Sequence, residues 1–113
     1  VHANGSLTLG ENIADHGGLQ VSYHAFKKAM ETAPLEVVDG FTPEQRFFLA
    51  YANVWAGNIR PEEILRLTKL DPHSLGKWRV DGALPHIANW YEAFNITEQD
   101  SMFVPKEKRV SIW

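Results

Sequence analysis

The 113-residue chain contains no cysteine, which excludes both a disulfide framework and a zinc site built on thiolates. It has no apolar run near the ~18 residues that would span a membrane. It also lacks a strong excess of one charge, because 11 basic and 14 acidic residues give a net charge of −3. No basic stripe runs among its aromatic residues, so we expect no nucleic-acid binding.

The chain is instead rich in apolar and aromatic residues, with 44% hydrophobic residues, four Trp and six Phe. This composition is typical of a folded protein rather than a disordered one. The length is also sufficient for one domain with a core of its own. We therefore expect residues 1–113 to form a single domain.

Apolar periodicity predicts an all-α fold of about four helices joined by long loops, and no segment alternates convincingly as a strand. The predicted helices span residues 10–31, 42–57, 61–70 and 85–94. Loop signals occupy residues 1–9, the segment 71–82 and the tail from residue 95.

The second helix has the clearest start signal in the chain. Thr42 fits the N-cap, Pro43 takes the first helical position, and Gln45 completes a capping box. The aromatic stripe that follows has helical spacing, so we expect it to lie in the core. Its members are Phe47, Phe48, Tyr51, Val54 and Trp55.

Glu11 and Asp15 lie four residues apart, so a helix places both carboxylates on one face. Like charges at this spacing repel unless a positive group lies beside them. Gly17 and Gly18 follow, and each costs a helix interior up to about 1 kcal/mol. A bound cation and a helix packed against the glycines would explain both features. The structural alternative is a capping box of Thr8 with Glu11, and a first-turn acid that suits the helix dipole.

Four stretches of the sequence carry a family resemblance. They are NGSLTLGENIADHGGL at 4–19, FFLAYANVWAG at 47–57, DPHSLGKWRVDG at 71–82 and NWYEAF at 89–94. In this order they cover most of the chain and resemble the zinc endopeptidases of the neprilysin and endothelin-converting-enzyme family. The end KRVSIW at 108–113 is similar to the short basic tail of that family, which closes on Trp.

The resemblance implies the C-terminal piece of a gluzincin catalytic domain with one catalytic Zn²⁺. Family members hold zinc with two His of a His-Glu-x-x-His helix and a Glu from a later helix, leaving one position for water. Glu11 matches that Glu, and Asp15 matches the acid that holds a zinc-ligating His and is sometimes assigned as proton donor. His73 matches the imidazole that stabilises the oxyanion, and Arg79 matches the arginine that binds substrate carbonyls.

The chain departs from the family pattern because none of its five histidines belongs to a His-Glu-x-x-His motif. We therefore expect it to be the C-terminal piece of a longer enzyme, inactive alone and partnered by the rest of its catalytic domain. An exposed face around Glu11 favours a homodimer of the isolated piece. The resemblance implies peptide substrates cut before hydrophobic residues, and an extracytoplasmic location. A Cys that animal relatives carry near Lys108 is absent, which favours a bacterial origin.

The sequence is also compatible with two alternatives. The chain could be a non-catalytic helical interaction module that keeps the family scaffold. Glu11 and His16 could also form a separate metal site, although adjacent helix positions point about 100° apart and His16 should face away from Glu11 and Asp15. His2, His24 and His86 are expected to be structural or surface residues.

Overall fold

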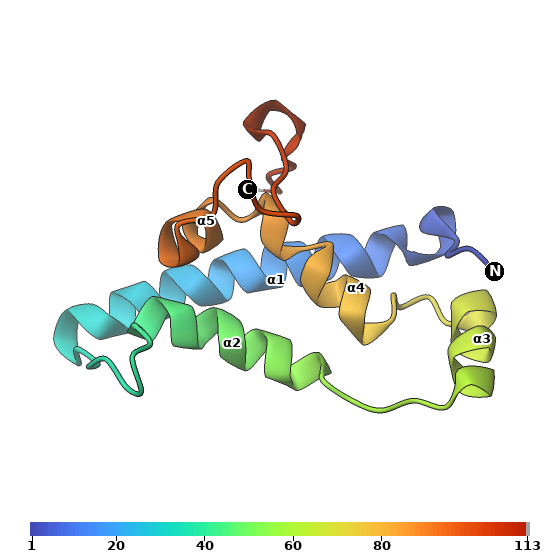
Figure 1. The fold of residues 1–113 in the computed structure, drawn as a ribbon, viewed down its shortest axis with the longest axis horizontal. Coiled ribbons are helices and arrows are strands. Elements are labelled where there is room, and N and C mark those ends of the chain that lie inside the picture. The colour runs from blue at the N-terminus through green and yellow to red at the C-terminus, as the bar shows by residue number, and fades with distance from the viewer. Residues whose placement is uncertain (113) are drawn as a thin grey trace.

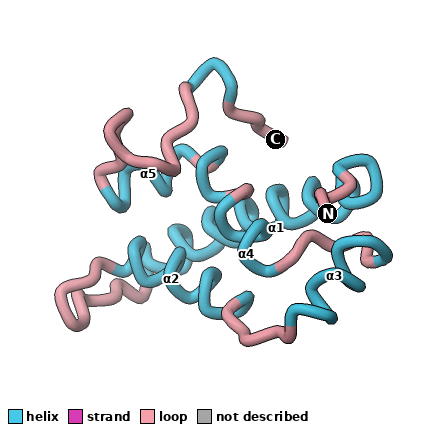
Figure 2. Tube along the Cα trace, turned by 45° about the vertical axis from the view of Figure 1, so that its right-hand side comes forward, coloured by secondary structure: helices cyan, strands magenta, loops and turns pink. Residues whose placement is uncertain are grey.

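The computed structural model describes residues 1–112 and confirms the predicted all-α class. Within these residues the chain forms five α-helices, two short 3₁₀ helices and no strand (Figure 2). The α-helices are α1 (Gly5–Thr32), α2 (Pro43–Trp55), α3 (Pro61–Leu70), α4 (Gly76–Asp81) and α5 (Ala88–Phe94). The 3₁₀ helices are η1 (Leu84–His86) and η2 (Lys106–Lys108). No described helix has the length and apolarity needed to cross a membrane.

Helix α1 begins at Gly5, so the prediction that residues 1–9 form a loop is wrong for most of that segment. Asn4 is the N-cap, and its side-chain oxygen accepts hydrogen bonds of 3.1 and 3.2 Å from two backbone N–H groups of the first turn. These bonds satisfy donors that a helix start leaves without partners. Thr8 already lies inside the helix, where its hydroxyl donates to the Asn4 carbonyl. The capping box of Thr8 with Glu11 is therefore not formed.

Helix α2 lies antiparallel beside α1 and is joined to it by residues 33–42 (Figure 1). Gly40 in this connection has a φ of +79°, a conformation that favours glycine. The capping box predicted for α2 is confirmed: Thr42 and Gln45 exchange hydrogen bonds between side chain and backbone at 3.0 and 3.1 Å. The amide of Gln45 also donates to the carbonyl of Ala93 at 2.9 Å, which ties the start of α2 to α5.

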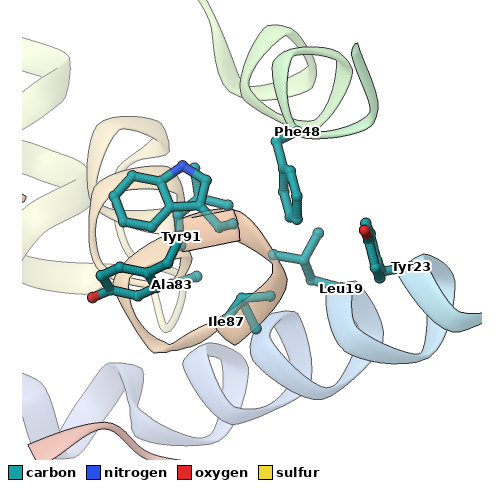
Figure 3. Close-up of a cluster of buried hydrophobic side chains, with 8 residues drawn as sticks. Leu19, Tyr23, Phe48, Ala83, Ile87 and Tyr91 are labelled. Carbon is teal, nitrogen blue, oxygen red and sulfur yellow. The ribbon is translucent and has the colours of Figure 1, made fainter. Parts of the chain in front are cut away.

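The hydrophobic core lies where α1, α2, η1 and α5 meet (Figure 3). Phe48 and Ile87 are its most enclosed side chains, 1% and 0% exposed, and the ring of Tyr23 stacks on Phe48 at 5.3 Å. The buried apolar residues are Leu19, Tyr23, Phe48, Ala83, Leu84, Ile87, Trp90 and Tyr91. The predicted core stripe of α2 is wrong at Val54, which is 69% exposed and lies one residue before the end of α2.

The segment 71–82 was predicted to be a loop, but it contains α4. This helix has only six residues and no side-chain cap, so neither periodicity nor capping signals indicate it. The helix predicted over 85–94 is also divided, into η1 and α5.

We expected a neighbouring helix to pack against Gly17 and Gly18, but no part of the described chain packs closely against Gly18. A Cβ added to Gly18 would meet no atom within 4 Å. Gly18 instead lines a hollow of about 390 Å³ between α1 and α2.

We predict that Phe48→Ala destabilises the fold by about 3–5 kcal/mol, because it leaves a cavity among buried rings that cannot fully close. Urea denaturation followed by tryptophan fluorescence measures this loss. Phe41→Ala is the matched control, since Phe41 is half-exposed, and it should cost about 1 kcal/mol or less. Equal losses for the two variants would contradict the placement of the core.

Candidate active site

Five ionisable side chains from three separate stretches of the chain meet beside α1. They are Glu11, Asp15, Asp71, His73 and Arg79, called the polar cluster below. Glu11 and Asp15 come from α1, Asp71 and His73 from the turn after α3, and Arg79 from α4. All four site residues predicted from the sequence are therefore in one place.

Asp15 and Arg79 form a two-pronged ion pair between α1 and α4. The Nε and Nη2 atoms of Arg79 donate to the two carboxylate oxygens of Asp15, both at 2.6 Å. The two side chains are only 16% and 14% exposed. The hydrogen bonds from Arg79 to Asp15 raise the pKa of the guanidinium. Arg79 is thus a positive group beside the carboxylates, which offsets the repulsion expected between Glu11 and Asp15.

Two residues of α2 hold Arg79 from the other side. The guanidinium carbon of Arg79 lies 3.7 Å from the centre of the Trp55 ring, a cation–π contact. The hydroxyl of Tyr51 donates to the backbone carbonyl of Arg79 at 2.9 Å. Burial, followed by the nearby charge of Asp15, raises the pKa of Tyr51. The helical spacing of the α2 stripe predicts Trp55 and Tyr51 in the core, and no local pattern connects either residue to Arg79.

His73 is held by a neighbour that sequence analysis missed. Its Nδ1 lies 2.7 Å from Oδ1 of Asp71, and its backbone N–H donates to the same oxygen at 2.9 Å. The backbone hydrogen bond and then the imidazole hydrogen bond hold the pKa of Asp71 below its usual value. An Asp that bonds the backbone two residues on is an Asx-turn, so the Asp-Pro-His sequence was a signal that could have found Asp71.

The other imidazole nitrogen of His73 faces Glu11. Nε2 of His73 lies 3.4 Å from Oε2 of Glu11, which is too long for a strong hydrogen bond. The turn that carries His73 is also attached to α1 one residue further on, where the Ser74 hydroxyl donates to the Asn12 side chain at 2.8 Å. The geometry therefore places an imidazole and a carboxylate face to face, with each side chain about half exposed.

Glu11 could supply one ligand to a metal ion, but the described chain does not provide a complete metal site around it. A carboxylate is an ordinary zinc ligand, and that of Glu11 is 45% exposed with only the long contact to His73 among the ion pairs found in residues 1–112. No group of three or more His, Asp or Glu side chains in that range is placed to hold a metal ion. The separate metal site considered for Glu11 and His16 is therefore not formed within the described chain.

His16 follows Asp15 but has a different environment. It is 6% exposed, and its ring lies 5.6 Å from the ring of His86. Burial, and then the neighbouring His86, lowers the pKa of His16, while burial and Arg109 lower the pKa of His86. Nδ1 of His86 accepts a hydrogen bond from the backbone of Val110 at 3.0 Å. His86 therefore has a structural role in anchoring the C-terminal tail, as expected.

Comparisons with known proteins place the chain in a family. The sequence pattern of Peptidase family M13 matches residues 1–110. Human neprilysin is 40% identical over 116 residues, which cover 99% of this chain and 15% of neprilysin. Human membrane metallo-endopeptidase-like 1 is 42% identical over 115 residues, which cover 99% of this chain and 14% of that protein.

A solved structure is similar over the same extent. The Mycobacterium tuberculosis zinc metalloprotease Zmp1 in its open state matches the fold with a TM-score of 0.94 and 38% identity, covering 99% of this chain and 17% of Zmp1. The chain spans about 15% of the length of the curated relatives that it matches. Since the family pattern covers residues 1–110 and the relatives align along almost the whole chain, the resemblance inferred from the motifs is confirmed and the chain belongs to Peptidase family M13.

Proposed function

We propose that the chain is part of a zinc metalloendopeptidase catalytic domain, to which Glu11 supplies the third zinc ligand. The observation that supports this is the meeting of Glu11, Asp15, His73 and Arg79 in the polar cluster of an M13 chain. The partners are peptide substrates and the remainder of the catalytic domain. Cleavage occurs before hydrophobic residues of short peptides, outside the cytoplasm.

The zinc ion fits Glu11, because this half-exposed carboxylate is not saturated by hydrogen bonds within the described chain. The other two protein donors come from the rest of the full-length protein, in the His₂Glu pattern of catalytic zinc. When bound, the ion supplies Lewis-acid polarisation of the peptide carbonyl.

Asp15 holds a zinc-ligating imidazole in the orientation that the metal requires. Each of its oxygens accepts one hydrogen bond from Arg79, and a carboxylate has about four acceptor positions in all. Asp15 can thus accept an imidazole N–H without releasing Arg79, and such a bond fixes the tautomer of a ligating His. The two-pronged geometry is that of an ionised carboxylate, which suits this holding role better than proton donation.

His73 and Arg79 bind the reacting peptide. Asp71 accepts the Nδ1–H of His73, which leaves Nε2 free, and with both ring nitrogens protonated Nε2 donates to the negative charge developing on the peptide oxygen. Arg79 has five N–H donors and uses two of them on Asp15, which leaves three for substrate carbonyls. Trp55 holds the plane of the guanidinium while these donors engage.

We predict that Glu11→Gln in the full-length enzyme weakens zinc binding by more than about 100-fold. Loss of a residue that only hydrogen-bonds a metal ligand already costs up to about 100-fold, and loss of the ligand itself should cost more. Competition with a chelator, read as bound zinc by mass spectrometry, measures the change. Glu31→Gln on the same helix removes the same charge from an exposed site and should retain zinc. Full zinc content in Glu11→Gln would rule out the ligand role.

We predict that His73→Ala lowers kcat by about 10²–10³-fold, because the transition state loses one placed donor. Zinc content should stay at the level of the unmodified enzyme. His24→Ala, an exposed histidine of α1, is the matched control and should retain kcat. Zinc loss as large as that of Glu11→Gln would mean that His73 is a ligand instead.

We predict that the 113-residue chain alone has no metal-dependent peptidase activity, because its described residues contain no group of three or more side chains placed to hold a metal ion. A fluorogenic peptide assay with added zinc, with and without chelator, measures this. Chelator-sensitive cleavage by the purified chain would contradict the proposal. The homodimer expected from the sequence stays a prediction, which sedimentation of the same sample tests.

A further inference from the structure

Helices α2 and α4 meet at a backbone contact that leaves room only for glycine. Gly76 is the first residue of α4, and Trp55 is the last residue of α2. A Cβ added to Gly76 would lie 2.6 Å from the backbone oxygen of Trp55 and 3.3 Å from its Cβ. The obstacle is backbone rather than the end of a flexible side chain, so it cannot be relieved by a change of rotamer.

This contact lies one helical turn from Arg79. Gly76 and Arg79 are three residues apart in α4, so they share the face that is turned toward α2. The same residue that Gly76 touches, Trp55, carries the ring on which the Arg79 guanidinium stacks at 3.7 Å. The approach of α4 to the end of α2 therefore sets the height of the guanidinium above Trp55 and its reach to Asp15.

We infer that Gly76, through its backbone contact with Trp55, is a positioning residue that places Arg79 on Trp55 and against Asp15 for substrate binding. The inference rests on the role of Arg79 proposed above. A methyl group at Gly76 forces the start of α4 away from α2 and withdraws Arg79 from both partners. A misplacement of about 1 Å in a catalytic site can cost about 10²-fold in rate.

Another glycine near the end of α2 provides a matched control. Gly57 follows Trp55 by two residues, and a Cβ added there would meet nothing within 4 Å. Gly57→Ala therefore adds the same methyl group in the same region without pushing on α4.

The test compares Gly76→Ala and Gly57→Ala in the full-length enzyme by kcat, KM, zinc content and Tm. Gly76→Ala is expected to lower kcat/KM by about 10²-fold with zinc retained, whereas Gly57→Ala should stay within about twofold of the unmodified enzyme, as a surface change does. Unchanged kcat/KM in Gly76→Ala overturns the inference.

A double-mutant cycle with Arg79→Ala separates positioning from a general structural effect. If Gly76 acts through Arg79, Gly76→Ala loses most of its effect once Arg79 is alanine. Additive losses overturn the inference and leave the role of Arg79 intact. Normal kcat/KM in Arg79→Ala alone overturns the proposed role of Arg79 itself, so the two failures can be told apart.

If Gly76→Ala yields no folded enzyme, variants of Trp55 test the stacking of Arg79 that the Gly76 contact is inferred to set. Trp55→Leu removes the aromatic surface under Arg79, and Trp55→Phe keeps one. We expect Trp55→Leu to lower kcat/KM and to have little further effect once Arg79 is alanine. Trp55→Phe should retain most of the activity that Trp55→Leu loses. Equal activity of the Leu variant and the unmodified enzyme overturns the inference.

Discussion

The ion pair of Asp15 with Arg79 is the interaction on which the arrangement of the polar cluster depends. It joins residues 64 positions apart in the sequence and connects the long helix α1 to the short helix α4. A helix of six residues has little stability of its own, so its orientation must come from tertiary contacts. Arg79 supplies three of these, through its guanidinium to Asp15, its stacking on Trp55 and its backbone carbonyl to Tyr51. Loss of one partner of such an enclosed pair would leave the other charge uncompensated.

His73 is positioned in a different way from Arg79. His73 is fixed by its own turn, where Asp71 binds both its backbone and its ring. The partner of His73 is therefore local in the sequence, whereas Arg79 needs partners on two other helices. His73 and Arg79 nevertheless contact the same face of α1, at Glu11 and at Asp15 respectively. Arg79 is thereby the cation that offsets the repulsion between Glu11 and Asp15, while Glu11 also faces the imidazole of His73.

Local signals predicted much of the fold because they act over a few residues. The capping box at Thr42 and Gln45 and the core position of Phe48 on α2 are both seen in the structure. The start of α1 was misplaced because Thr8 imitates a cap that Asn4 provides. Helix α4 was missed because it is too short to show periodicity.

The residues of the candidate site could be predicted, but their contacts could not. The family motifs pointed to each of the four residues separately. The pairing of Asp15 with Arg79 and the platform of Trp55 join distant segments, and no spacing in the sequence specifies which distant segments touch. Asp71 is the exception, since its turn is local.

The early start of α1 has a consequence for Glu11. With the cap at Asn4, Glu11 lies well inside the helix rather than in its first turn, where end fraying concentrates. The backbone beneath this carboxylate is therefore ordered independently of any ligand. In the ligand role proposed for Glu11, metal binding restricts only the side-chain torsions, so the entropy lost is smaller than for a donor on a fraying end.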